Sequence, residues 1–225
     1  MFELKKGSLY VVATPIGNLS DLSPRARDVL AQVDLICAED TRHTRQLLNA
    51  VGLEKSLLAL HEHNESERVA QILAQLQAGK SLALVSDAGT PLISDPGYRL
   101  VRELRAAGIV ISPVPGPCAA IAALSVAGIA SDRFSFEGFL PHKASARRER
   151  LQGLAGEART LVFYESSHRI EECLADMRAA FGDGREAVLA REITKKFESV
   201  LDGTLDSNDD KVAADANQRK GEFVL

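Results

Sequence analysis

Residues 81–97 read SLALVSDAGTPLISDPG, a short apolar run followed by a long loop that is rich in turn-forming residues. The run Ser81–Val85 has the length and composition of a buried strand. A helix is expected to begin at Asp95 and to continue to Gly108, and the next apolar run, Ile109–Val114, predicts another strand. This order of strand, helix and strand is typical of a parallel βαβ unit.

The same alternation extends toward the N-terminus. Ser23 and Pro24 are a typical helix start, and Asn64 followed by Glu67 resembles a capping box. We therefore expect an α/β domain with a mostly parallel sheet over residues 1–113. Its other expected strands are Ser8–Ala13, Asp34–Ala38 and Ser56–Leu60, and its other expected helices are Pro24–Gln32, Thr41–Val51 and Asn64–Gly79.

The second half has a different pattern and predicts an α+β domain with a mixed sheet over residues 114–225. A Pro-rich stretch, residues 113–117, separates the two halves. Asp202-Gly203 between two short apolar runs predicts a β-hairpin, and the polar segment 206–218 is expected to pack poorly. Helices are expected at Cys118–Ala127 and Arg169–Phe181, and strands at Phe134–Gly138, Thr160–Tyr164 and Glu186–Arg191.

Composition narrows the class of protein. Among 225 residues, 45% are hydrophobic, and 27 Lys and Arg against 31 Asp and Glu give a net charge of −4. No apolar run is long enough to cross a membrane and no leader segment is visible, so we expect a cytoplasmic protein without a membrane partner. The three cysteines form no CxxC pair, and His61 and His63 lack a third ligand, so neither a disulfide framework nor a metal site is expected.

Three loops at the carboxyl ends of predicted strands are richer in Gly and Pro than a simple turn requires: residues 14–19 (TPIGNL), 86–97 and 115–120 (PGPCAA). Each alone is compatible with an ordinary turn. Together they favour a ligand crevice, because open α/β sheets bind ligands at this edge. Gly79-Lys80-Ser81 lacks the first glycine and the strand–helix context of a P-loop, and no GxGxxG motif follows a strand.

Charged clusters leave alternatives open. Asp40 follows the second predicted strand and either caps the next helix or accepts a proton at the sheet edge. The basic segment 142–150 is either a solvated helix face or a contact for an anionic partner, because Lys and Arg supply most of the sequence-independent affinity for nucleic acid.

The ordered strings TPIGNLSDLSPRA, AEDTRHT, LVSDAGTPLISDPGY, PGPCAA, EGFLP, TLVFYESSHR, AREITK and KGE closely resemble the small-subunit ribosomal RNA 2′-O-ribose methyltransferases of the tetrapyrrole-methylase superfamily. This resemblance implies a two-domain methylase fold that binds S-adenosylmethionine between its domains, a homodimer, no metal, and a cytidine of 16S rRNA in the small ribosomal subunit as the substrate. Family members usually continue beyond KGE, so we expect the C-terminal domain to be cut short at Leu225.

The resemblance also implies roles for single residues. Asp40 is the first candidate for a proton acceptor, with Glu39, Glu165 and Glu192 as rivals. A small-molecule methylase and a non-catalytic RNA-binding module remain the alternatives. The implied cofactor contacts are Pro15, Ser86, Asp87, Ala88, Gly89, Thr90, Ile93, Cys118, Ala119, Glu165 and Ile193. The expected RNA contacts are Arg42, Lys143, Arg147, Arg148, Arg169 and Lys195.

Overall fold

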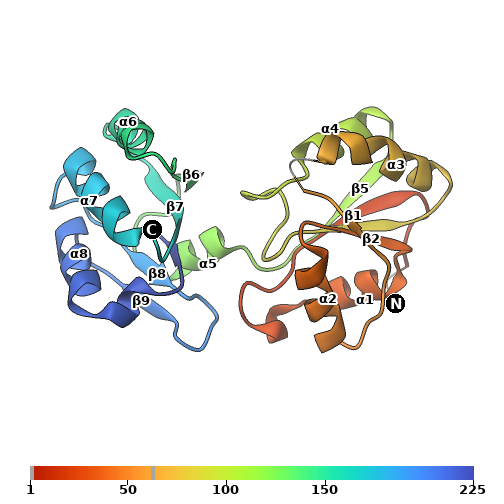
Figure 1. The fold of residues 1–225 in the computed structure, drawn as a ribbon, viewed down its shortest axis with the longest axis horizontal. Coiled ribbons are helices and arrows are strands. Elements are labelled where there is room, and N and C mark those ends of the chain that lie inside the picture. The colour runs from red at the N-terminus through yellow and green to blue at the C-terminus, as the bar shows by residue number, and fades with distance from the viewer. Residues whose placement is uncertain (1–2, 62–63) are drawn as a thin grey trace. The chain divides into compact units, whose positions relative to one another are not determined.

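The computed structural model describes residues 3–61 and 64–225. His63, which the sequence analysis considered together with His61 as a possible metal ligand, lies outside the described residues. The chain divides into two compact units, Met1–Cys118 and Ala119–Leu225, which are described separately (Figure 1). No helix in the described part of the chain is long and apolar enough to span a membrane.

The first unit is built on a five-stranded parallel sheet, as the sequence predicted, with strand order β3-β2-β4-β1-β5. All five strands therefore end at the same edge. The strands are β1 (Ser8–Val12), β2 (Leu35–Ala38), β3 (Leu57–Ala59), β4 (Leu82–Val85) and β5 (Val110–Val114). The helices are α1 (Pro24–Gln32), α2 (Thr41–Ala50), α3 (Glu65–Gln77) and α4 (Tyr98–Ala106), with a 3₁₀ turn, η1 (Leu19–Asp21).

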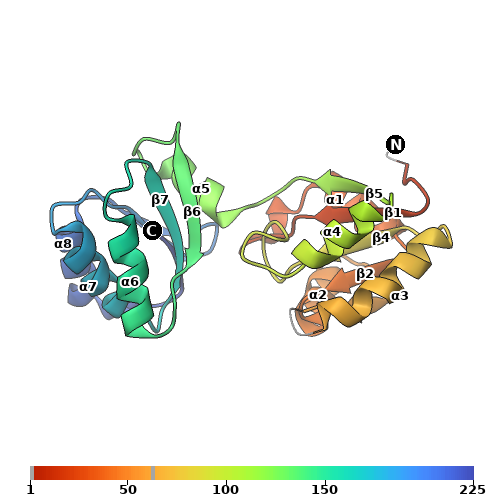
Figure 2. The ribbon, with the colours of Figure 1, turned by 90° about the horizontal axis from the view of Figure 1, so that it is seen from above.

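Successive strand residues point to opposite faces, and both faces of this sheet are buried. Helices α1 and α2 cover one face and α3 and α4 the other (Figures 1 and 2). The first face packs Tyr10, Val12, Val29, Leu30, Ile36 and Ala83. The second packs Leu9, Cys37, Ile72, Leu82, Leu84 and Leu100.

Two helix starts in this unit differ from the sequence prediction. Ser23 caps α1 as expected, but the Asn64 side chain makes no cap hydrogen bond to α3 and its Oδ1 accepts from the His61 amide at 2.9 Å. Helix α4 begins after Gly97, whose φ of 126° suits glycine, rather than at Asp95. Glu65 Oε1 accepts from the Leu100 amide at 2.7 Å and satisfies a free amide of the first turn of α4.

The second unit contains a mixed sheet of order β6-β7-β10-β8-β9, in agreement with the predicted α+β class. Strand β6 is parallel to β7, and the other pairs are antiparallel. Helices α6, α7 and α8 pack on one face, and α5 packs against β7 and β10 (Figure 2). The elements are α5 (Ala119–Val126), β6 (Phe134–Phe139), α6 (Ala144–Leu154), β7 (Thr160–Ser166), α7 (Ile170–Phe181), β8 (Leu189–Arg191), β9 (Ser199–Leu201), α8 (Leu205–Ala214), η2 (Ala216–Arg219) and β10 (Glu222–Val224).

The hairpin predicted at Asp202-Gly203 is wrong. Strand β9 pairs with the preceding β8, and Thr204 instead caps α8 in a reciprocal capping box with Ser207. The prediction that segment 206–218 packs poorly is also wrong, because Asn208 and Val212 of α8 are fully buried. Asp202-Gly203 followed by the capping residue Thr204 therefore marks the start of helix α8 and not a hairpin turn.

Candidate functional site

Two of the three strand-end loops are joined directly to each other. The Thr14 amide donates to the Gly89 carbonyl at 2.9 Å, and the Gly89 amide donates to the Thr14 carbonyl at 3.1 Å. The Thr14 hydroxyl also donates to the Ser86 carbonyl at 3.4 Å. The loops after β1 and β4 therefore form one backbone-bonded structure.

The loop after β5 joins the same structure. The Thr90 hydroxyl donates to the Pro117 carbonyl at 2.9 Å, and a Cβ on Gly116 would lie 3.0 Å from the Cβ of Ala13. We call the region held by Thr14, Gly89, Thr90 and Pro117 the loop junction. Convergence of three loops is what a ligand crevice requires and what isolated turns do not provide.

Within the loop junction, any residue other than glycine at position 89 would be strained. Its φ is +80°, and a Cβ built there would lie 3.3 Å from Ile16 Cγ2 and 3.7 Å from the Pro117 carbonyl oxygen. Next to it, Ala88 is exposed. Small side chains here leave the backbone open to close approach by a ligand.

Backbone strain flanks two implied cofactor contacts, one in each unit. Among the described residues, four that are not glycine have a positive φ: Leu92 and Ser94, which flank Ile93, and Glu192 and Thr194, which flank Ile193. Such conformations cost about 1–3 kcal/mol each and concentrate at ligand sites. Ile93 and Ile193 are both among the implied cofactor contacts.

Asp40 is not suited to accept a proton. Its side chain caps α2 by accepting from the Arg42 amide at 2.8 Å, and it forms an ion pair with Arg42 at 2.7 Å. The hydrogen bonds from Arg42 hold the pKa of Asp40 well below its usual range. The structure therefore supports the helix-cap interpretation of Asp40, whose carboxylate is already engaged by Arg42.

A carboxyl group that the sequence analysis did not select is better suited. Asp95 lines an open pocket of about 530 Å³ together with Glu39, His61, Glu65 and Tyr98. Burial raises the pKa of Asp95 to about 7, with a smaller contribution from the nearby charges of Glu39 and Asp87, and a hydrogen bond from Ser86 partly offsets the rise. Sequence showed Asp95 only as a helix start.

Asp87 connects this pocket to the neighbouring strand end. Its Oδ1 accepts from the Asp40 amide at 3.0 Å, which ties the end of β4 to the end of β2. Burial and the charge of Asp87 raise the pKa of Glu39. The edge of the sheet next to the loop junction therefore carries negative potential, which is complementary to a cationic ligand.

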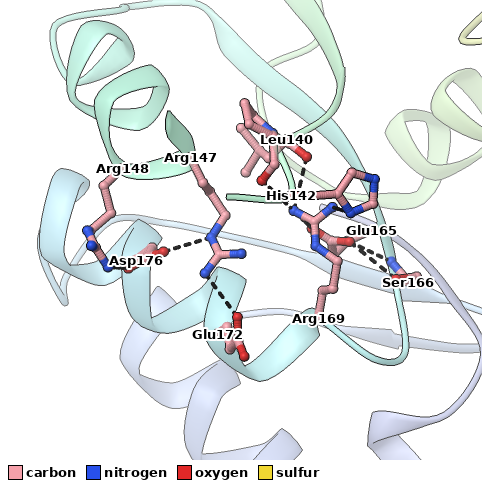
Figure 3. Close-up of polar contacts among 10 residues, drawn as sticks. Leu140, His142, Arg147, Arg148, Glu165, Ser166, Arg169, Glu172 and Asp176 are labelled. Atoms are coloured by element: carbon pink, nitrogen blue, oxygen red, sulfur yellow. Dashed lines mark hydrogen bonds and ion pairs between the residues drawn. The ribbon is translucent and has the colours of Figure 1, made fainter. Parts of the chain in front are cut away.

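In the second unit, Glu165 is buried and holds a different set of contacts (Figure 3). Its Oε1 accepts from the Ser166 amide at 2.9 Å, and its Oε2 lies 3.4 Å from Arg169. Arg169 in turn donates to the carbonyls of Leu140 and Pro141 at 3.0 and 2.9 Å. Glu165 and Arg169 thus anchor the chain that follows β6.

Lys195, an expected RNA contact, and Glu192, a rival candidate for the proton acceptor, form an ion pair. Lys195 lies 2.9 Å from Glu192 and 2.8 Å from Glu222. Burial alone would raise the pKa of Glu192, but hydrogen bonds from the Glu222 amide and Lys195 outweigh it and lower the pKa. Glu192 is therefore an ionised partner of Lys195.

Arg147, one of the expected RNA contacts, is buried inside the second unit. Its side chain is 3% exposed and binds Asp176 at 2.7 Å and Glu172 at 3.2 Å (Figure 3). It therefore links α6 to α7 instead of facing a partner. Lys143 and Arg148 on the same segment remain exposed, and Arg42 keeps 88% of its side chain exposed beside Asp40.

The expected cofactor contacts thus fall into two groups. The first unit brings eight of them to the strand-end loops: Pro15, Ser86, Asp87, Ala88, Gly89, Thr90, Ile93 and Cys118. The second unit contains Ala119, Glu165 and Ile193. Within residues 3–61 and 64–225, no group of three or more His, Cys, Asp or Glu side chains is arranged to hold a metal ion.

This parallel sheet with converging strand-end loops, followed by a mixed-sheet unit, matches a known class. The family model of the tetrapyrrole (corrin/porphyrin) methylases matches residues 8–208, and the chain belongs to this family. It is a methyltransferase, and enzymes of this family take the methyl group from S-adenosylmethionine. The loop junction, with the carboxylates of Glu39 and Asp87 at the neighbouring strand ends, fits a cofactor that carries a sulfonium cation.

Several curated relatives share more than half of their aligned residues with the chain. One from Xylella fastidiosa strain Temecula1, named ribosomal RNA small subunit methyltransferase I, is 65% identical over 219 residues, covering 97% of this chain and 80% of the relative. Proteins of the same name from Pseudomonas aeruginosa and Escherichia coli O157:H7 are 57% and 55% identical, covering 99% and 98% of this chain and 79% and 77% of the relatives.

Solved structures share the fold. Cobalt precorrin-4 methyltransferase, a cobalamin biosynthetic enzyme, superposes with a TM-score of 0.69 at 19% identity, covering 97% of this chain and 94% of that one. Uroporphyrin-III C-methyltransferase from Thermus thermophilus gives a TM-score of 0.63 at 21% identity, covering 97% and 93%. This likeness confirms the two-domain methylase architecture.

Proposed function

We propose that this protein transfers a methyl group from S-adenosylmethionine to the RNA of the small ribosomal subunit. The observation that carries the proposal is the 55–65% identity, over nearly the whole chain, to relatives whose name states this activity. The solved tetrapyrrole methylases support only the fold, so no specific observation favours a small-molecule substrate. The family membership counts against a non-catalytic module.

The finer part of the proposal is the 2′-hydroxyl of a cytidine in 16S rRNA as the acceptor. It is supported by the resemblance of the ordered motif strings to small-subunit ribosomal RNA 2′-O-ribose methyltransferases, and the AEDTR and FYESSHR strings favour RNA over a tetrapyrrole. We also propose that the enzyme acts as a homodimer in the cytoplasm. The expected RNA contacts that remain are Arg42, Lys143, Arg148, Arg169 and Lys195, of which Arg169 and Lys195 have partners within the protein.

S-adenosylmethionine, when bound, supplies an electrophilic methyl group. The loop junction holds the cofactor in our proposal, with Ala88, Gly89 and Thr90 as the close contacts, and Ala119, Glu165 and Ile193 are kept as contacts on the resemblance alone. A hydroxyl acceptor must lose its proton as it is methylated. We propose Asp95 as the acceptor of this proton, because it lines an open pocket that Glu39 at the end of β2 also lines, and burial raises its pKa to about 7.

The test uses small ribosomal subunits that lack this modification, the purified protein and labelled S-adenosylmethionine. We expect label in 16S rRNA, and nucleoside mass spectrometry should find it as 2′-O-methylcytidine. Label in a uroporphyrinoid instead of RNA would favour the small-molecule alternative. Tight binding to the subunit without methyl transfer would favour the non-catalytic alternative, and label on a base would overturn only the choice of the 2′-hydroxyl.

A further inference from the structure

A β-bulge in β6 gathers three aromatic side chains on one face of the second sheet. The register between β6 and β7 pairs Phe136 with Val162 and Phe139 with Tyr164, and it shifts between Phe136 and Gly138. Regular alternation would place Phe136 and Phe139 on opposite faces. The inserted residue reverses this alternation, so both phenylalanines lie on the face of Tyr164.

The rings contact one another. The Tyr164 centroid lies 4.9 Å from Phe136 and 5.5 Å from Phe139, with the ring planes inclined at 70° and 65°. The Tyr164 hydroxyl accepts from the Ala120 amide at 3.0 Å, in the first turn of α5. Tyr164 is therefore fixed at both ends, and it holds the two phenylalanines in defined orientations.

Phe139 remains 55% exposed, although its ring is held against Tyr164. The edge contact to Tyr164 uses part of its surface and leaves ring surface open. The chain that follows Phe139 carries an exposed cation, Lys143. Arg169 holds this chain in place, because it donates to the carbonyls of Leu140 and Pro141 and lies 3.3 Å from His142 Nδ1. An exposed ring followed four residues later by an exposed lysine is complementary to an unpaired nucleotide, whose base stacks and whose phosphate is anionic.

We infer that Phe139, oriented by Tyr164 and Phe136, is a stacking platform for an unpaired base of the RNA substrate, with Lys143 contacting a neighbouring phosphate. The inference rests on the proposed RNA substrate and adds the residue that receives a base. Stacking is sequence-tolerant, so this contact positions the RNA strand and does not select the target nucleotide.

The absence of tryptophan from the sequence gives a direct test. Phe139→Trp creates a single-tryptophan protein whose indole can stack in place of the phenyl ring. We expect octacytidine or a small-subunit rRNA fragment to quench its fluorescence. Phe134→Trp, at the other end of β6 and 38% exposed in the native residue, is the matched control and should change little. Equal quenching of both variants, or none at Phe139→Trp, would overturn the inference.

Affinity measurements show whether Phe139 stacks on a base of the RNA or on the adenine of the cofactor. Phe139→Ala and Phe139→Leu should each raise the KM for small subunits about tenfold, the loss expected for one base stack, while the Kd for S-adenosylmethionine stays unchanged. Phe139→Trp should keep the native KM. Quenching of Phe139→Trp by S-adenosylmethionine alone, or a weakened cofactor Kd in Phe139→Ala, would assign the ring to the cofactor and overturn the inference. If the native protein does not methylate RNA at all, the proposed function fails first.

Discussion

The backbone amide of Arg147 donates to the carbonyl of Lys143 at 2.9 Å, so these two basic residues lie one helical turn apart, yet only Lys143 is exposed. Arg147 is enclosed between Asp176 and Glu172. Two basic residues of the same segment, which the sequence alone does not distinguish, are therefore a surface cation and a structural one. The difference has separate consequences for RNA affinity and for stability.

Alanine at each position should show this difference. Lys143→Ala is expected to weaken RNA binding and to reduce the slope of log affinity against log salt by about 1, without changing the Tm. Arg147→Ala should lower the free energy of unfolding by about 3–5 kcal/mol, because it leaves Asp176 without its buried partner. Denaturant titration and binding isotherms at several salt concentrations measure both. A normal Tm for Arg147→Ala would contradict its structural role.

Substitution of Gly89 tests the loop junction. Gly89→Ala should weaken S-adenosylmethionine binding by tenfold or more, because its Cβ would meet Ile16, and Gly89→Arg should abolish binding. Gly108 is the matched control, since its φ of +76° imposes a similar backbone cost of about 1 kcal/mol but nothing lies within 4 Å of an added Cβ. Calorimetry on Gly89→Ala and Gly108→Ala compares them. Similar cofactor affinities in the two variants would refute the placement of the cofactor.

Asp40→Asn and Asp95→Asn should differ in their effect on methyl transfer. Asp40→Asn keeps a good helix cap and should retain methyl transfer within about twofold. Asp95→Asn removes the proposed proton acceptor and should slow methyl transfer roughly 10²–10⁴-fold with little effect on the cofactor Kd. In the native enzyme, the single-turnover rate should rise with pH through about 7 as Asp95 loses its proton. A slow Asp40→Asn variant with an active Asp95→Asn variant would reverse the assignment.

The raised pKa of Asp95 also predicts a pH-dependent stability. Asp95 is neutral in both folded and unfolded states below about pH 4, so its contribution to stability is fully present there and is lost as the pH rises through about 7. Asp95→Asn should therefore stabilise the protein above pH 7 and have little effect at pH 4. A shift of this size corresponds to about 4 kcal/mol, and solvent screening of the partly exposed carboxyl reduces the expected gain to about 1–2 kcal/mol. Unfolding curves of both proteins at the two pH values measure this difference, and an equal difference at both would contradict the prediction.

The parallel sheet could be predicted from the sequence because hydrophobic runs such as Ser81–Val85 alternate with capped helices at regular spacing. The loop junction was also within reach, since Gly89 and Pro117 follow strands that must end at one edge. The hairpin at Asp202-Gly203 failed because the same residues also suit a chain that enters a helix at Thr204. Pairing of β9 with β8 depends on tertiary contacts that a turn motif does not contain.

The chemistry of single side chains was harder to predict. Asp40 and Asp95 both lie next to helix starts, and only burial and neighbouring charges separate a paired cap from a carboxyl with a raised pKa. The burial of Arg147 depends on α7, which follows it in the chain. The face of Phe139 depends on a one-residue bulge that reverses strand alternation next to Gly138, whose φ is +65°. In the sequence, a glycine inside a strand indicates a bulge but does not specify it.

The position of β10 between β7 and β8 has a consequence for synthesis of the chain on the ribosome. Residues 222–224 follow β7 and β8 in the chain, so until they emerge these two strands lack the strand that joins them. The first unit has all its strands by Val114 and can fold while the rest is still being translated. Until β10 has emerged, the edges of β7 and β8 that pair with it stay open, and open strand edges are templates for pairing with other chains.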